Sequence, residues 1–145
     1  MATREKTKRQ NAAVEAPTRS AVREMVADRI PPQAIDAEVA VIGAMLLDES
    51  SVGPVTEILD EQAFYRGAHR KIFRAILDLF SKEEAVDLVT VTQELKKTKL
   101  LDDVGGAAYL SQVLGSVATT ANVRHHAKIV LEKAVLRRLI NVATE

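Results

Sequence analysis

The sequence predicts an all-α fold, a small bundle of about six helices that closes with a long terminal helix. Three observations support this prediction. Apolar residues recur at spacings of three and four from residue 35 onward, which is the period of an α-helix. Only residues 86–89 have the pattern of a short extended piece. The length of 145 residues and the hydrophobic content of 47% suit one domain with its own core.

Residues 1–29 differ from the rest in charge and in apolar content. They carry seven basic and four acidic residues, whereas the remainder carries 13 basic and 16 acidic ones. Few large apolar side chains precede Ile30, so we expect a disordered basic arm. Such an arm can contact phosphates, and the alternative is a solvated tail. Pro31 and Pro32 mark the entry to the folded part. We expect a helical head over residues 30–121 and a last helix over residues 122–145.

Three helices are expected in the first half of the head. The small residues Gly43 and Ala44 in the first helix would let a neighbouring helix approach closely. Ser50 or Ser51 can cap the second, short helix. The third helix follows a turn that ends at Gly67. The core-facing stripes comprise Ile35, Val39, Ile42 and Leu46 in the first helix, Val52, Val55, Ile58 and Leu59 in the second, and Ile72, Phe73, Ile76, Leu77 and Phe80 in the third.

Two further helices complete the predicted head. After the extended piece at residues 86–89, Thr90 and Gln93 have the spacing of a capping box, which predicts a helix start at Thr90. That helix ends in the basic stretch 96–99, where positive charge favours a helix C-terminus. Residues 105–106, both glycine, interrupt the chain before a helix that stops near Gly115.

The last predicted helix, capped by Asn122, has apolar residues on two opposite sides. At about 100° per residue, the apolar face moves round the helix near Ala134. The first half is expected to pack on the head, whereas little apolar sequence remains to cover the second half, which therefore needs a partner outside this chain. The first side comprises Val123, Ala127, Val130, Leu131 and Ala134, and the second comprises Val135, Leu136, Leu139, Ile140, Val142 and Ala143.

Composition and motifs exclude several kinds of chemistry. The formal charge is zero, which argues against nucleic-acid binding by bulk positive charge, and without cysteine there are no disulfides or thiolate metal sites. No apolar run spans a bilayer and no secretory signal opens the chain, so we expect an intracellular protein without membrane contact. Glycine-rich phosphate-binding motifs are absent, and His69 has no recognisable partner, which favours a helix-start or surface role over that of a base. The sequence predicts no catalytic, cofactor-binding or metal-binding residue.

Five ordered blocks of sequence lie within residues 30–145. They are Pro31-Pro32-Gln33 with Asp36-Ala37-Glu38 and residues 41–47; Phe64-Tyr65 with His69, Ile72-Phe73 and Ala75-Ile76; residues 86–90; residues 105–110; and Ala121-Asn122-Val123 with residues 129–130, 132–134 and 136–140. Each block alone is weak, but their order and spacing together are specific, and together they resemble the N-terminal domain of DnaB-type replicative DNA helicases. One departure is Ala118, where the family commonly has proline.

The resemblance implies a fold, an activity and partners. In this family an all-α N-terminal domain precedes a RecA-like motor, which would lie wholly beyond residue 145 together with its ATP and Mg²⁺ site and its contacts to single-stranded DNA. The parent is a hexamer that unwinds DNA in the cytoplasm. Its N-terminal domains form a collar, a trimer of dimers, that docks primase, and a helicase loader is a further partner. Residues 122–145 would be the first arm of a helical hairpin, truncated here, and this chain would be a non-catalytic collar domain without a cofactor of its own.

The two arguments meet at the second half of the last helix. We expect its apolar residues to be assembly contacts, surrounded by a polar rim of basic residues; the alternative is an ordinary intrachain core. A competing function is a small helical nucleic-acid-binding module that uses its basic N-terminal arm. Loss of salt-dependent binding to single-stranded DNA on deletion of residues 1–29 would favour it. The expected contacts are Leu136, Leu139, Ile140 and Ala143, and the expected rim residues are Lys133, Arg137 and Arg138.

Overall fold

The computed structural model describes residues 18–21 and 30–144, and within them it contains helices and no strand. The prediction of an all-α fold is confirmed. The expected disordered arm falls mostly outside the described residues. In the described part from residue 30 onward there are six α-helices and two 3₁₀ turns: α3 (Ile35–Leu47), η1 (Glu49–Ser51), α4 (Val52–Thr56), η2 (Glu61–Ala63), α5 (Gly67–Ser81), α6 (Leu88–Lys97), α7 (Gly106–Gly115) and α8 (Val123–Thr144).

Helix α3 is the central element of the head. It contacts α8, α7 and α5, and its buried residues surround most of its circumference rather than forming one stripe. The predicted stripe is therefore too narrow, because it leaves out Ala37, Val41 and Met45, which are buried. The close approach expected at Gly43 is confirmed, since a Cβ atom there would lie 2.8 Å from the carbonyl oxygen of Val113 in α7.

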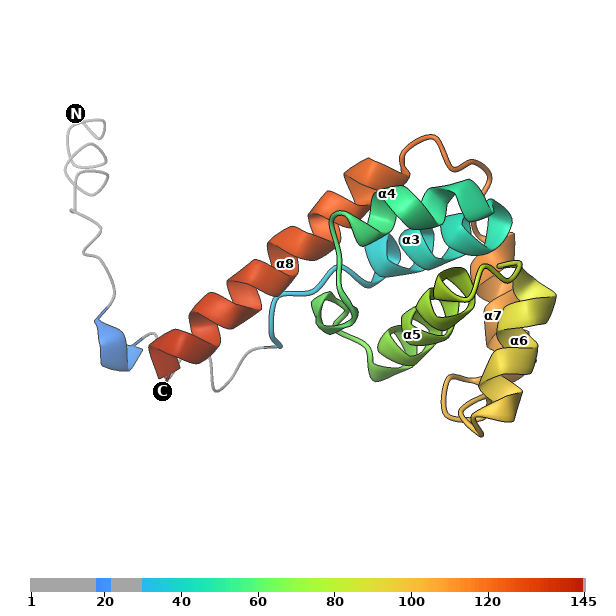
Figure 1. Cartoon of the computed structure of the whole chain (residues 1–145). Helices are drawn as coiled ribbons and strands as arrows, with labels where there is room; N and C mark the ends of the chain where they lie inside the picture. Colours follow the sequence, from blue (N-terminus) through green and yellow to red (C-terminus); the bar gives the residue numbers. More distant parts are fainter. Residues whose placement is uncertain (1–17, 22–29, 145) are drawn as a thin grey trace, which may run out of the picture.

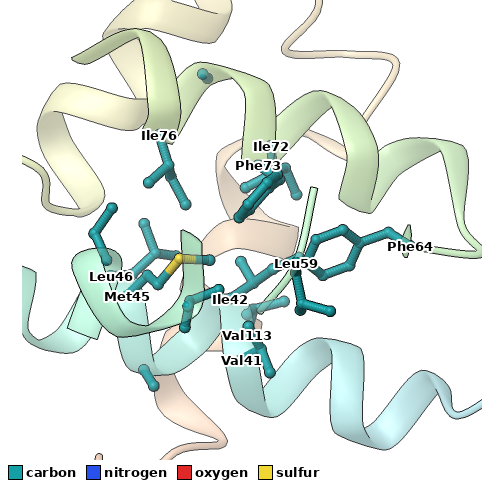
Figure 2. Packing of buried hydrophobic residues seen from close by; sticks show 14 of the residues in the cluster. Val41, Ile42, Met45, Leu46, Leu59, Phe64, Ile72, Phe73, Ile76 and Val113 are labelled. Carbon is teal, nitrogen blue, oxygen red and sulfur yellow. The ribbon is translucent and has the colours of Figure 1, made fainter. Parts of the chain in front are cut away.

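The core lies between α3, α5 and the loop that precedes α5. Figure 2 shows Ile42 and Met45 of α3 facing Ile72, Phe73 and Ile76 of α5. Phe64 closes one end of this core, and its ring centroid lies 4.9 Å from that of Phe73 in a tilted arrangement that aromatic pairs prefer. These side chains are almost wholly buried, so they supply the main hydrophobic stabilisation of the head.

Three local predictions need correction. Residues 86–89 are not an extended piece, because α6 begins at Leu88. Its N-cap is Asp87, whose carboxylate accepts from the Thr90 amide while the Thr90 hydroxyl accepts from the Asp87 amide, so the capping box lies three residues earlier than predicted. Ser51 is the N-cap residue of α4, one of the two positions predicted, but its side chain forms no capping hydrogen bond. The cap with a side-chain bond is Asp48 at η1, whose carboxylate accepts from the Ser50 amide at 3.0 Å.

The stripe of α5 also differs at its C-terminal end. Ile72, Phe73 and Ile76 are buried as predicted, but Leu79 is buried where Phe80 was expected, and Phe80 is 41% exposed. From Ile76 the buried stripe therefore continues by a step of three residues to Leu79, rather than by a step of four to Phe80.

Helix α8 starts and packs as the sequence predicts. It begins at Val123, directly after Asn122, and its N-terminal half packs on α3 and α4. Figure 1 shows its C-terminal half running on past the head as a rod. Of the residues predicted to face the head, Leu131 is half-buried and the others are buried: Val123, Ala127, Val130 and Ala134.

Candidate functional site

The second apolar side of α8 is exposed. Val135, Leu136, Leu139 and Val142 are 42%, 38%, 60% and 71% exposed, respectively. At about 100° per residue they lie within one arc of the helix, so they form a continuous stripe, which we call the α8 apolar face. Exposed large aliphatic side chains at helical spacing are typical of a surface that a partner covers.

The other predicted contact residues border this face. Ile140 and Ala143 are half-buried, Arg138 is exposed, and Lys133 is half-buried. The α8 apolar face therefore includes Leu136 and Leu139 of the predicted contacts, together with Val135 and Val142.

Arg137 differs from the other predicted rim residues, because its guanidinium is used within the chain. One terminal nitrogen donates to the carbonyl oxygen of Pro32 at 2.8 Å, and the other donates to the carbonyl oxygen of Ala63 at 2.8 Å. The guanidinium carbon also lies 5.4 Å from the ring centroid of Tyr65, within cation–π distance. Arg137 thus joins α8 to two segments of the head that are far apart in sequence.

Partial burial lowers the pKa of Arg137, because desolvation disfavours the charged form. The negative charge of Glu38 opposes this effect on the pKa, whereas the positive charge of Arg70 adds to it. A guanidinium begins from so high a pKa that it stays charged at neutral pH. Arg137 therefore provides a permanent cation where α8 meets the head.

A buried acid–histidine–tyrosine chain lies beside this contact. Glu38 of α3 and His69 of α5 are 1% and 0% exposed, and Nδ1 of His69 donates to Glu38 Oε1 at 2.8 Å. A carboxylate can only accept, so a neutral His69 carries its proton on Nδ1, and Nε2 accepts from the Tyr109 hydroxyl at 2.6 Å. Glu38 also accepts from the backbone amides of Tyr65 at 2.8 Å and Arg66 at 3.4 Å.

The chain of Glu38, His69 and Tyr109 corrects the prediction for His69. His69 does lie at the start of α5, but it is fully buried and has two side-chain partners. The order acid, imidazole and hydroxyl matches that of catalytic triads, yet the hydroxyl belongs to a phenol and the imidazole has no solvent access. The arrangement fits a buried hydrogen-bond network that ties α3, α5 and α7 together.

Sequence reasoning missed this network and the contacts of Arg137 because the partners are distant in the chain, although three of the residues, Glu38, Tyr109 and Arg137, have a local feature that marks them. Glu38 is a charged residue within the apolar first helix. Gly105, at φ +104°, adopts a left-handed conformation just before α7 and lies against the Cβ of Tyr109, 2.8 Å from where a Cβ of its own would be. Arg137 continues the spacing of four, three, four and three along the buried side of α8, after Ala134.

The basic residues at the start of α5 have partners within the chain. Arg70 donates to the carbonyl oxygens of Phe64 at 3.0 Å and Tyr65 at 2.8 Å. Lys71 and Arg74 form ion pairs at the surface, with Asp103 at 3.5 Å and with Asp78 at 3.3 Å. With these contacts inside the chain, the basic residues of this face resemble an ordinary solvated surface rather than a phosphate site.

Two adjoining grooves lie at the start of α3 beside α8, and both are lined by Asp36 and His126. Ser116 lines the first groove, but its hydroxyl donates to the carbonyl oxygen of Val113 at 2.7 Å. No hydrogen bond joins Asp36, His126 and Ser116 in this part of the structure. Among residues 18–21 and 30–144, no three histidine or acidic side chains come together as metal ligands would, and no helix is long and apolar enough to cross a membrane.

The family model of the DnaB-like helicase N-terminal domain matches residues 30–132. The chain is 52% identical over 121 residues to the replicative DNA helicase DnaB of Geobacillus stearothermophilus, and 50% identical over 121 residues to the replicative DNA helicase DnaC of Bacillus subtilis. Each alignment covers 83% of this chain and 27% of the relative, so the chain spans about a quarter of the length of these helicases.

The fold has a counterpart among solved structures. The crystal structure of the N-terminal domain of DnaB helicase from Mycobacterium tuberculosis matches with a TM-score of 0.78 and 45% sequence identity. The match covers 79% of this chain and 80% of that one. Sequence and fold agree on the resemblance stated above: the chain belongs to the family of DnaB-like helicase N-terminal domains.

Proposed function

We propose that this chain is the non-catalytic collar domain of a replicative DNA helicase, and that it assembles into a hexamer, as a trimer of dimers, and docks primase. The observation that carries the assembly proposal is the exposure of Leu136 and Leu139 on α8. The relatives that the chain matches are replicative DNA helicases, and the match is to their N-terminal domain. The parent would unwind DNA in the cytoplasm.

The α8 apolar face is the proposed contact between copies. Burial of its four aliphatic side chains would contribute on the order of several kcal/mol at about 25 cal/mol per Å², before the costs of association. The half-buried Ile140 and Ala143 extend the contact, and Lys133 and Arg138 form its polar rim. We assign α8 to the first arm of a helical hairpin. The second arm and a neighbouring subunit would share this face.

The chemistry of unwinding would belong to a RecA-like motor domain outside this chain, with its ATP, its Mg²⁺ and its contacts to single-stranded DNA. The role of this chain would be geometric: it holds motors in a ring and offers a surface for primase, and a helicase loader is a further partner of the parent. We assign no catalytic role to Glu38, His69 and Tyr109, because solvent does not reach the imidazole that would act as base.

Sedimentation velocity over a range of concentrations tests the assembly proposal. The unmodified chain should sediment above the monomer mass at high concentration, and Leu136→Asp and Leu139→Asp should remain monomeric, because a buried carboxylate in the contact costs several kcal/mol. Val89→Asp is the matched control, since Val89 is equally apolar and 64% exposed but lies on α6. A monomeric unmodified chain, or unchanged association of both α8 variants, would contradict the proposal.

Primase capture tests the docking proposal with the same variants. Immobilised unmodified chain should retain primase, and the monomeric Leu139→Asp chain should retain it as well if docking uses the head rather than the α8 apolar face. Failure of the unmodified chain to retain primase contradicts the docking proposal. Loss of primase only with the α8 variants would place docking on the assembled collar instead.

A further inference from the structure

The loop Ala63–Arg66 is held from two directions. From one side, the guanidinium of Arg137 on α8 donates a hydrogen bond to the carbonyl oxygen of Ala63 and lies over the Tyr65 ring. From the other side, the carboxylate of Glu38 accepts hydrogen bonds from the backbone amides of Tyr65 and Arg66. The loop therefore links Arg137 of α8 to the buried hydrogen-bond network of Glu38, His69 and Tyr109.

Arg137 lies at the point where α8 leaves the head. The apolar residues that hold the helix on the head end at Ala134, and the C-terminal half of α8 then runs past the head (Figure 1). Arg137 occupies the next position of that buried side, one turn further on. Its two hydrogen bonds fix α8 against Pro32, just before α3, and against Ala63, at the end of η2.

We propose that Arg137 is a positioning residue, a latch that fixes the direction in which α8 leaves the head. A guanidinium suits this role because its planar fork donates to two carbonyl oxygens at once, which a lysine ammonium on a flexible stem does not reproduce. Glu38, which His69 and Tyr109 orient, holds in place the loop to which Arg137 donates its hydrogen bond. The consequence for assembly rests on the proposed function: the latch orients the α8 apolar face, so its loss weakens the contact between copies without any change to that face.

The direction of α8 is measured as a distance between two spin labels. The chain contains no cysteine, so Lys97→Cys on α6 and Arg138→Cys on α8 introduce the only labelling sites, both at exposed positions. An excess of unlabelled chain keeps the measured distance within one molecule. In this background Arg137→Lys should broaden the distance distribution, with helical content by circular dichroism retained.

Arg124→Lys is the matched control, because it makes the same chemical change on α8 at an exposed arginine whose contact is a surface ion pair with Glu57 at 3.5 Å. It should leave the distribution unchanged. A distribution that is the same in Arg137→Lys as in Arg124→Lys overturns the latch. Tyr109→Phe is a second variant, which should speed amide exchange at Tyr65 and Arg66. Unchanged amide exchange at Tyr65 and Arg66 overturns the role assigned to Glu38, His69 and Tyr109 in holding the loop.

Sedimentation then tests the consequence for assembly. Arg137→Lys should weaken self-association several-fold relative to Arg124→Lys. Equal association of the two variants, despite a broadened distance distribution, overturns the orienting role in assembly. If the unmodified chain does not associate at all, the proposed function fails, and the distance distribution still decides the latch.

Discussion

The carboxylate of Glu38 on α3 accepts a hydrogen bond of 2.8 Å from Nδ1 of His69 on α5, and both side chains are buried. Two backbone amides, of Tyr65 and Arg66, donate to the same carboxylate. A charged group survives in the centre of this small head because N–H donors replace the water it lost. The pair also explains why the central helix of the head contains a buried acidic residue.

Glu38→Gln should destabilise the chain by about 1–3 kcal/mol. Three N–H groups donate to the Glu38 carboxylate, and the amide nitrogen of a glutamine side chain cannot accept a hydrogen bond from any of them. The free energy of unfolding in urea measures this loss. Asp36→Asn, an exposed residue on the same helix, removes the same charge and should change stability by less than about 0.5 kcal/mol. Equal effects of the two substitutions would show that the network contributes nothing specific.

Gly43→Ala should destabilise by about 1–3 kcal/mol, because the new Cβ would meet the side chain of Val117 and the carbonyl oxygen of Val113. Gly53 in α4 has open space around its Cα, so Gly53→Ala should be neutral or stabilise by up to about 1 kcal/mol through helix propensity. Thermal unfolding of the two variants compares them directly. A tolerated alanine at Gly43 would mean that α3 and α7 pack less closely than described.

Asp48 gives a pH dependence of known sign. Hydrogen bonds from the Ser50 hydroxyl and amide lower the pKa of Asp48 below its ordinary value. The folded state thus binds the proton more weakly than the unfolded state, so the stabilisation is present above pH about 4 and is lost as pH falls through the lowered pKa. Asp48→Asn should flatten this part of the stability–pH curve.

Glu49→Gln serves as the control for Asp48, since the Glu49 side chain forms no hydrogen bond or ion pair within residues 30–144. Urea unfolding between about pH 2 and pH 6 should show the flattening only in Asp48→Asn. A curve for Asp48→Asn that runs parallel to that of the unmodified chain would contradict the assigned cap.

Sequence reasoning found the features that depend on local periodicity. The two apolar sides of α8 follow from spacing alone, and the structure buries Val130 and Ala134 while exposing Leu139. Caps were harder to place, because Asp87 and Thr90 are both good cap residues three positions apart, and the choice between them depends on where α6 meets the rest of the head.

Contacts between distant residues could not be predicted in this way. The sequence predicts Arg137 at the polar rim of an interface, yet its guanidinium donates to the backbone carbonyl oxygens of Pro32 and Ala63, which lie more than seventy residues away in the chain. A carbonyl carries no sequence signature, since every residue has one. Only the position of Arg137 on the buried side of α8 hinted at its role.

The most direct test of the central claim, that the α8 apolar face joins copies of this chain, is a dilution series of amide correlation spectra by nuclear magnetic resonance. With rising concentration the resonances of Val135, Leu139 and Val142 should shift or broaden, whereas those of Phe80 and Val89, exposed apolar residues on the head, should not. Spectra that are independent of concentration, or changes confined to Phe80 and Val89, would contradict the claim.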